Sequence, residues 1–242
     1  MTTEEFATFA RQPSGRVLNP ERLALVSGII FTILQLGVLM YFISLVFPQM
    51  GPPDAVEQHL AFYTQHGEVL RLGNYLLTLP TAFFLFFLGG LSGILRSAEG
   101  GRPVLATTAI ISGAIVAILW PLSAALNNIG IDIAQAGGDA ATIVALDGIG
   151  VYLLALSALP RTVLLAAMSI VLLHSQLAPR WVGWLGLGLG LISIIGSATL
   201  VLVNLFPVLA FSTLLFELWI LVVSVALWRN QAAIQHLSLS TL

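Results

Sequence analysis

The chain has 242 residues, of which 58% are hydrophobic and only 8% are charged, with a formal net charge of −2 and a mean hydropathy of +0.99. Soluble domains carry about 25% charged residues, so this composition excludes an ordinary water-soluble domain and indicates a lipid bilayer as the solvent. The sequence contains no cysteine and no lysine, which excludes thiolate metal sites, disulfides and Schiff-base cofactors, and its low net charge argues against a nucleic-acid partner.

Residues 1–22 are predicted to form a cytoplasmic N-terminal tail. They include the acidic residues Glu4 and Glu5 and the helix breaker Pro13. A continuous apolar stretch, 23–47, follows the tail. Because the apolar core of a cleavable signal peptide is only about 7–15 residues long, we expect this longer stretch to be retained as the first membrane span.

Six apolar stretches are long enough to cross the hydrocarbon core of a bilayer, which takes about 20 helical residues. Backbone amides inside lipid must bond within their own segment, and the stretches lack the alternating pattern of barrel strands, so the expected fold class is all-α. Together they form a six-helix transmembrane domain over 23–228, in which only two of the spanning residues are charged. The expected spans are 23–47, 73–95, 104–126, 152–173, 181–203 and 208–228.

The connection between the first two spans, 48–72, is expected to be an outer loop that contains a short helix. Asp54 and Glu57 have the spacing of a capping box, and Gly67 is placed to end the helix. We expect this helix to lie on the membrane surface or to form a lid over the bundle.

A second outer loop is expected at 127–151, between the third and fourth spans. Gly137 and Gly138 interrupt it, because adjacent glycines disfavour a continuous helix. Asp139 is placed to cap a new helix. We therefore expect the last part of this loop to run directly into the fourth span.

Arginines in short loops predict which side of the membrane each loop occupies, because such loops are retained in the cytoplasm. With six spans, seven arginines fall on one side, whereas the opposite side holds one arginine and six acidic residues. Trp181, Trp184 and Trp228 fall near the same boundary, where aromatic residues anchor spans. We therefore expect both termini, including the C-terminal tail 229–242, to be cytoplasmic, and the chain to be a multi-pass protein of the bacterial cytoplasmic membrane. The seven arginines are Arg11, Arg16, Arg22, Arg96, Arg102, Arg180 and Arg229.

Arg161 and Glu217 are the two charged residues within the expected spans. Each lies nine residues into a span that runs inward, about 13 Å below the outer boundary at a rise of 1.5 Å per residue. An ionisable side chain at this depth normally faces the bundle interior and has a partner, so we predict an intramembrane ion pair. Gln35, Thr213 and Ser157 lie on suitable faces and are expected to extend the pair into a polar network.

Several interpretations of this pair remain open. It either staples helices together or forms a binding centre, in which Glu217 exchanges a proton or Arg161 holds an anionic head group. Alternatively, Pro160 begins the fourth span, and Arg161 then lies at the outer interface and extends its guanidinium to water.

His59 and His66 are the weak candidates for ligands in the outer loop. They are seven residues apart on the expected loop helix and therefore share one face. Their separation of two turns, about 10 Å, is too long for one metal ion without a third group. We predict no metal site and no bound cofactor, and the sequence identifies no catalytic residue.

Two pairs of glycines have the four-residue spacing that allows helices to approach closely. They are Gly89 with Gly93 in the second span and Gly186 with Gly190 in the fifth. Each pair is expected to mark a contact, either within the chain or with another subunit.

Two stretches carry a resemblance to a known group of proteins. Residues 177–186, Leu-Ala-Pro-Arg-Trp-Val-Gly-Trp-Leu-Gly, and residues 19–24, Asn-Pro-Glu-Arg-Leu-Ala, resemble uncharacterised bacterial six-span integral membrane proteins of the domain-of-unknown-function type. The resemblance covers most of the chain in hydropathy and these two stretches in residues. It implies the six-span layout and transfers no catalytic residue.

We expect an accessory or scaffolding membrane subunit that packs against partner proteins or binds an apolar ligand or lipid. The spans contain few strongly polar groups, whereas the path of a hydrated solute needs more polar lining. Expected partners are membrane lipids, other membrane subunits or a second copy of the chain. The alternative is a small proton-coupled transporter that uses Glu217 and Arg161. An enzyme is disfavoured, because the spans contain no cluster of residues typical of a catalytic site.

Overall fold

The computed structural model describes residues 20–46, 48 and 56–230, so the expected cap Asp54 and most of both expected tails lie outside it. Every regular element in these residues is helical, which confirms the all-α prediction. Within the described residues, six helices are long and apolar enough to cross a membrane, as expected of a multi-pass integral membrane protein. The elements are α2 (Pro20–Tyr41), η1 (Phe42–Val46), α4 (Val56–Glu99), α5 (Val104–Gln135), α6 (Ala140–Ser175), α7 (Arg180–Ser197), η2 (Ala198–Leu200), η3 (Val203–Leu205) and α8 (Phe206–Arg229).

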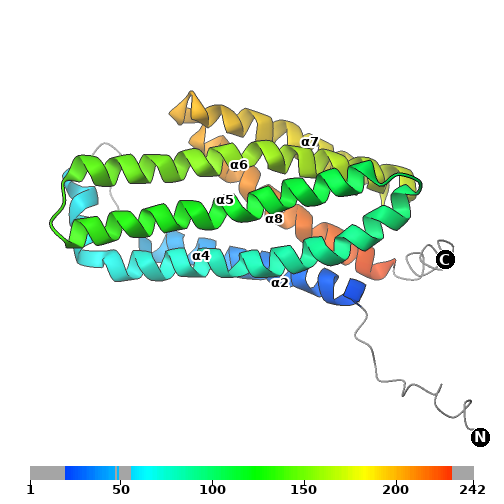
Figure 1. Cartoon of the computed structure of the whole chain (residues 1–242), viewed down its shortest axis with the longest axis horizontal. Coiled ribbons are helices and arrows are strands. Elements are labelled where there is room, and N and C mark those ends of the chain that lie inside the picture. The colour runs from blue at the N-terminus through cyan, green and yellow to red at the C-terminus, as the bar shows by residue number, and fades with distance from the viewer. Residues whose placement is uncertain (1–19, 47, 49–55, 231–242) are drawn as a thin grey trace, which may run out of the picture.

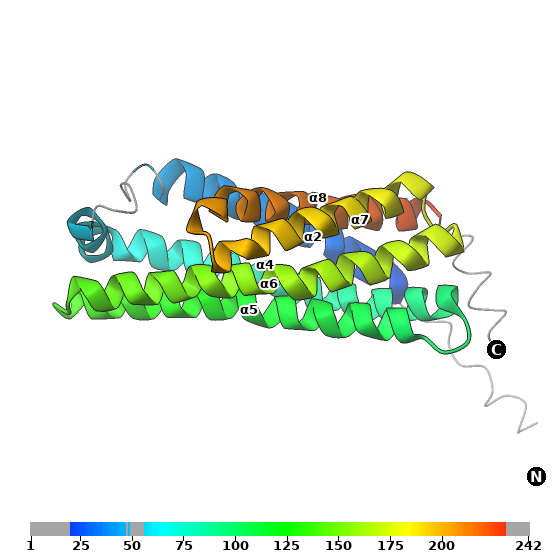
Figure 2. The same ribbon diagram turned by 90° about the horizontal axis from the view of Figure 1, so that it is seen from above.

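The long helices form an elongated up-and-down bundle (Figures 1 and 2). Each packs against the next long helix in the chain, and α8 returns to pack against α2, which closes the ring. As a result, the start of α2 and the end of α8 lie at the same end of the bundle (Figure 1). We call this the arginine end, and the opposite end, which holds the α5–α6 turn, the polar end. The arginine end carries Arg22, Arg96, Arg102, Arg180 and Arg229.

The bundle is apolar both inside and outside. Phe84, Phe87 and other large side chains in the interior are fully buried. On the outer surface, Phe86, Ile118 and Leu191 are 64–65% exposed. Apolar residues on all sides of a helix are typical of a membrane span, because lipid replaces water around it.

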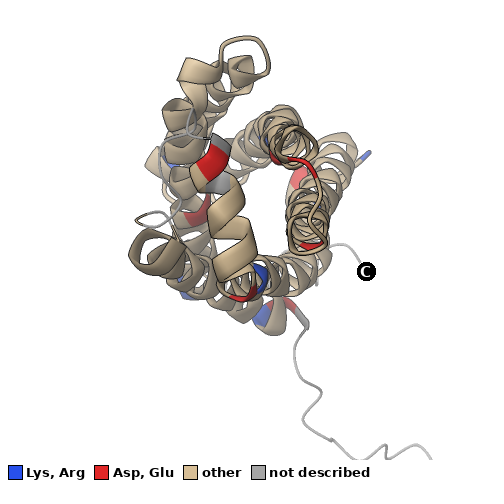
Figure 3. Cartoon of the chain, turned by 90° about the vertical axis from the view of Figure 1, so that its left-hand side faces the viewer, with Lys and Arg blue, Asp and Glu red and all other residues tan. Residues whose placement is uncertain are grey.

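The first turns of α4 form the helix expected in the first outer loop. The backbone of His66 is not helical, with φ −122° and ψ 21°, and the helix bends there. Figure 3 shows this first part crossing the polar end of the bundle. Phe62 and Tyr63 are buried against Ile131 and Ile143, so the segment, which we call the lid, packs against α5 and α6 near the turn that joins them. The helix continues beyond Gly67 because the chain bends without breaking.

The segment expected to form the second outer loop, 127–151, is mostly helical as well. The expected restart at Asp139 is confirmed: its side chain accepts a hydrogen bond from the Thr142 amide at 2.9 Å and caps α6. Gly137 has φ +79°, which glycine adopts at little cost. The turn itself covers only residues 136–139. The third expected span ended too early and the fourth began too late, because polar residues lower the hydropathy without ending a helix. The fifth expected span, 181–203, ran past the end of α7 at Ser197.

The two glycine pairs have different surroundings. A Cβ at Gly186 would come within 2.7 Å of the Trp219 ring, so glycine is what lets α7 approach α8 here. The Trp219 Nε1 also donates a hydrogen bond to the Val182 carbonyl oxygen at 3.0 Å. By contrast, a Cβ at Gly89 or Gly93 would meet nothing within 4 Å. The pair on α7 therefore serves packing within the chain, and the pair on α4 faces outward.

Candidate functional site

Arg161 is fully buried within α6. Its Nη2 donates a hydrogen bond to Ser212 Oγ at 2.8 Å, and its Nη1 donates to Thr213 Oγ1 at 2.5 Å. The guanidinium carbon also lies 5.8 Å from the centre of the Phe216 ring, within the range of a cation–π contact. All three partners belong to α8, which makes little other contact with α6. Arg161 therefore acts as a strut between these two helices.

The position of Arg161 rules out one interpretation of the sequence. The fourth span does not begin at Pro160, because α6 begins at Ala140 and Pro160 lies inside it. The guanidinium does not extend to water, since none of the Arg161 surface is exposed.

The two hydroxyls that contact Arg161 are oriented by their own helix. Ser212 Oγ and Thr213 Oγ1 each donate to the Leu209 carbonyl oxygen, at 2.8 and 2.9 Å. Because the only hydroxyl proton is used there, the lone pairs of each oxygen are left for the guanidinium. The arginine is thus held by neutral acceptors that need no charge of their own.

The predicted direct ion pair between Arg161 and Glu217 is wrong. Both residues are described and buried, yet the guanidinium contacts hydroxyls and not the carboxylate. Successive residues on a helix are about 100° apart, so Glu217 is rotated away from the face on which Phe216 meets Arg161. The two groups still lie close enough for their charges to act on one another.

The backbone of Glu217 contacts α2. Thr32 Oγ1 donates to the Glu217 backbone carbonyl at 3.0 Å. Gln35 is 3% exposed, and its Oε1 is buried without a hydrogen-bond partner. The Glu217 side chain is 7% exposed, and its carboxylate accepts no hydrogen bond from the described residues.

Of the residues expected to extend the polar network, the structure places Thr213 directly on Arg161 and Ser157 nearby. Ser157 lies one helical turn before Arg161 and accepts a hydrogen bond from Trp120 Nε1 at 3.1 Å. Gln35 is buried on α2, and no hydrogen bond joins its Oε1 to the others.

An aromatic cluster from four helices surrounds this centre. Phe31 on α2, Phe84 on α4, Trp120 on α5 and Phe216 on α8 have ring centroids 5.0–6.3 Å apart. All four are at most 4% exposed. Because one of these rings also faces the guanidinium, the cluster and Arg161 form one packed unit. The sequence offered no signal for it, since aromatic residues occur throughout the spans.

A second polar cluster lies under the lid at the polar end, and the sequence reasoning missed it. Asn127 Nδ2 donates to Asp147 Oδ1 at 2.8 Å and to the Tyr63 hydroxyl at 2.5 Å, and that hydroxyl donates to Asp147 at 3.0 Å. Asn74 Nδ2 donates to Asn127 Oδ1 and Asn128 Oδ1, both at 2.8 Å. This amide clamp joins α4, α5 and α6. The adjacent asparagines 127 and 128 were the available signal.

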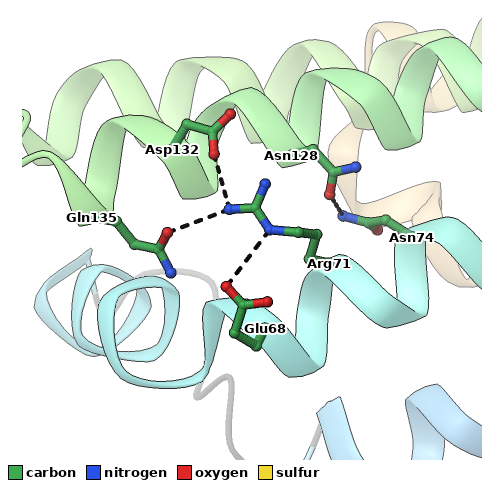
Figure 4. Close-up of polar contacts among 6 residues, drawn as sticks. All are labelled: Glu68, Arg71, Asn74, Asn128, Asp132 and Gln135. Atoms are coloured by element: carbon green, nitrogen blue, oxygen red, sulfur yellow. Dashed lines mark hydrogen bonds and ion pairs between the residues drawn. The ribbon is translucent and has the colours of Figure 1, made fainter.

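Arg71 makes a more exposed contact beside the amide clamp (Figure 4). Its Nη2 lies 2.9 Å from Asp132 Oδ1 and 3.3 Å from Gln135 Oε1, and its Nε lies 3.8 Å from Glu68. The side chains of Arg71 and Asp132 are 35% and 63% exposed. This group binds α4 to the end of α5.

The candidate histidine ligands lie near the bend of α4. The ring of His66 stacks on Phe62, with centroids 5.5 Å apart. The side chain of His59 lies outside the part that the structure describes. Among the described residues, no group of three histidine, aspartate or glutamate side chains is placed to hold a metal ion.

Comparison with known proteins gives no further guide to the site. No protein-family model, curated protein or solved structure matches the chain. The description of the chain accordingly depends on its own structure: a multi-pass bundle whose described residues form six long helices around a buried, aromatic centre.

Proposed function

We propose that the chain is an accessory or scaffolding subunit of a membrane assembly, which packs against partner proteins or binds an apolar ligand or lipid. The observation that carries this proposal is the way in which Arg161 is held. Its Nη1 and Nη2 each donate to a hydroxyl of α8, its Nε has no hydrogen-bond partner among the described residues, and its face lies on the Phe216 ring. A centre of this kind fixes the relative positions of helices, whereas a solute pathway needs polar groups that water or solute can reach.

The outward glycines on α4 support a partner surface. Gly89 and Gly93 are exposed, and no described residue approaches the place where their side chains would be. Small residues at this spacing let a second helix approach closely in lipid. The partner is either another membrane protein or a second copy of this chain.

Single cysteines test this surface cleanly, because the natural chain has none. A Gly93→Cys variant is labelled in native membranes with a thiol-attached photo-crosslinker and then illuminated. The matched control is Ile118→Cys on α5, which is 64% exposed to the surroundings. We expect a discrete adduct from Gly93→Cys that is absent from Ile118→Cys, and its mass distinguishes a second copy from another subunit. The same faint pattern from both positions would contradict the proposal.

A small proton-coupled transporter remains the second candidate, because the Glu217 carboxylate accepts no hydrogen bond from the described residues. A carboxyl group in apolar surroundings can bind and release a proton in a transport cycle. The test compares the unchanged protein with Glu217→Gln in proteoliposomes that carry an internal pH dye and a pH gradient. Glu217-dependent proton movement with intact folding would favour the transporter. Equal proton movement would favour the scaffold.

We also propose that the arginine end faces the cytoplasm of a bacterial cell. Arginines in short loops support this orientation. It is tested with single cysteines at two exposed positions, His174→Cys at the arginine end and Ala136→Cys at the polar end. In intact cells, a membrane-impermeant maleimide should label Ala136→Cys alone, and the opposite result would reverse the orientation.

A further inference from the structure

A groove of about 760 Å³ lies on the surface of the bundle at the arginine end. One wall is the α6–α7 turn, 176–179, together with Trp181 at the start of α7. The other wall is one face of α8, from Leu221 to Asn230. None of the residues that line it belongs to the Arg161 centre, so the groove is a separate feature.

The groove is graded from apolar to polar along α8. The part farther from the end of α8 is lined by Leu221, Val222 and Val225, and the part at that end by Arg229 and Asn230. Eight residues separate Leu221 from Arg229, about 12 Å along the helix axis. An apolar groove of this length with a cation at one end fits a lipid that has an acyl chain and an anionic head group.

The mouth of the groove is arranged for an anion. Arg229 is exposed and makes no ion pair with a residue that the structure describes, and the lining contains no acidic side chain. The start of α7 has Pro179 at its N-cap position and no side chain that caps it, so its first amides add partial positive charge. Asn230 Nδ2 is already used, since it donates to the carbonyl oxygens of Gln176 and Leu177 at 3.4 and 3.1 Å. Arg229 is the charged side chain of the lining and is therefore the group placed to bind the anion.

The groove also lies where a lipid head group would be. Trp181 forms part of its wall and is 56% exposed. Exposed tryptophans at the end of a spanning helix are typical of the boundary between hydrocarbon and head groups. The polar mouth then faces the head-group layer, and the apolar part faces the acyl chains.

We propose that this groove binds one anionic phospholipid, with its phosphate at Arg229 and the start of α7 and an acyl chain along Leu221 and Val225. The proposal requires that the protein is embedded in a membrane, but it does not require the scaffolding function. If the protein binds the lipid but Gly93→Cys forms no adduct, the lipid-groove proposal stands and the partner-surface proposal fails.

The full-length protein is incubated with vesicles that contain equal amounts of phosphatidylglycerol, which is anionic, and phosphatidylcholine, which has no net charge. Native mass spectrometry then measures which lipid remains bound to the protein. We expect a single tightly bound phosphatidylglycerol, and a loss of about tenfold in its retention in Arg229→Gln, since a charge-assisted contact is lost. The matched control is Arg96→Gln, because Arg96 is an exposed arginine at the same end and lies outside the groove.

A second variant keeps the charge and alters the apolar half. Val225→Phe narrows the groove and should also reduce phosphatidylglycerol retention, with unchanged helicity by circular dichroism. The proposal is overturned by equal retention of both lipids, or by equal losses in Arg229→Gln and Arg96→Gln. It is also overturned if inorganic phosphate displaces the lipid completely. A variant that ends at Asn230 is a further test: if it binds the lipid and the full-length protein does not, residues 231–242 occupy the groove and the proposal fails.

Discussion

Arg161 and Arg71 are held in opposite ways. Arg161 is completely buried, and its partners are two neutral hydroxyls and an aromatic ring. Arg71 is 35% exposed, and its partners include the carboxylates of Asp132 and Glu68. The buried arginine thus lacks the direct ion pair that the exposed one has.

The difference shows that burial, more than the charge of the partner, decides what an arginine contributes. An ion pair at the surface is screened by water and contributes about 0–1 kcal/mol. A buried guanidinium cannot turn to water if its partners are lost, so each neutral acceptor matters more. Arg161 with its neutral partners should therefore stabilise the bundle more than Arg71 with its charged partners. The following predictions test this order.

The largest effect is expected from Arg161→Ala. This change empties a large buried site and leaves Glu217 without the nearby positive charge, so it should lower the free energy of unfolding by about 3–5 kcal/mol. The measurement is thermal and denaturant unfolding in detergent micelles, followed by circular dichroism. A variant as stable as the unchanged protein would contradict the assignment of Arg161 as a strut.

Two further variants separate volume from charge at this position. Arg161→Met keeps most of the volume, and Ser212 and Thr213 keep their hydrogen bonds to Leu209, so it should be less damaging than Arg161→Ala. Adding Glu217→Gln to Arg161→Ala should restore part of the stability, because the carboxylate is the charge left alone. A full double-mutant cycle measures this coupling.

The second effect is expected at the amide clamp, with Asn127→Ala. This change removes the donor to Tyr63 and Asp147 and the acceptor of Asn74 in a partly buried place. Unsatisfied buried polar groups cost about 1–3 kcal/mol, so the effect should fall between those of the two arginines. Proteolysis of the lid is the readout, since Tyr63 belongs to its buried side. Asn128→Ala, which removes one acceptor only, should give the smaller change.

The third effect is expected from Arg71→Ala. The exposed ion pairs with Asp132 and Glu68 should contribute about 0–1 kcal/mol and should weaken as salt increases. The unfolding free energies of the variant and the unchanged protein are therefore compared at low and high salt, where their difference should shrink. A loss as large as that from Arg161→Ala would reverse the order of the two arginines.

The sequence was sufficient to predict the helices and the burial of Arg161, because both follow from the cost of polar groups in lipid. It was insufficient to predict the partner of Arg161. Equal depth places Arg161 and Glu217 at similar heights, but the direction in which each faces depends on helix rotation, and Phe216 takes the position opposite the guanidinium.

The amide clamp was missed for a related reason. Asn127 and Asn128 were assigned to a loop because they end an apolar stretch, yet α5 continues through them to Gln135. Hydropathy indicates where lipid ends and says little about where a helix ends. Glu99 is a similar case: its carboxylate accepts hydrogen bonds from the Leu105 and Ala106 amides at 2.9 and 2.8 Å, and only the chain reversal brings them together.

The smallest effect is expected at Asp139, which lies in water and extends the comparison to a charge with no burial. Hydrogen bonds from the Thr142 hydroxyl, and then from its amide, lower the pKa of the Asp139 carboxyl. Because the pKa is lowered in the folded state, the carboxylate stabilises α6 at pH values above the unfolded pKa of about 3.9. This contribution is lost as the pH falls through the lowered pKa of the folded state.

The measurement is hydrogen exchange at the Thr142 amide, whose protection factor should therefore decrease in acid. Asp139→Asn keeps a capping oxygen without the charge, so its protection should be almost independent of pH. If both proteins lose protection equally, the charge of Asp139 contributes nothing to the cap, and its oxygen alone holds the Thr142 amide.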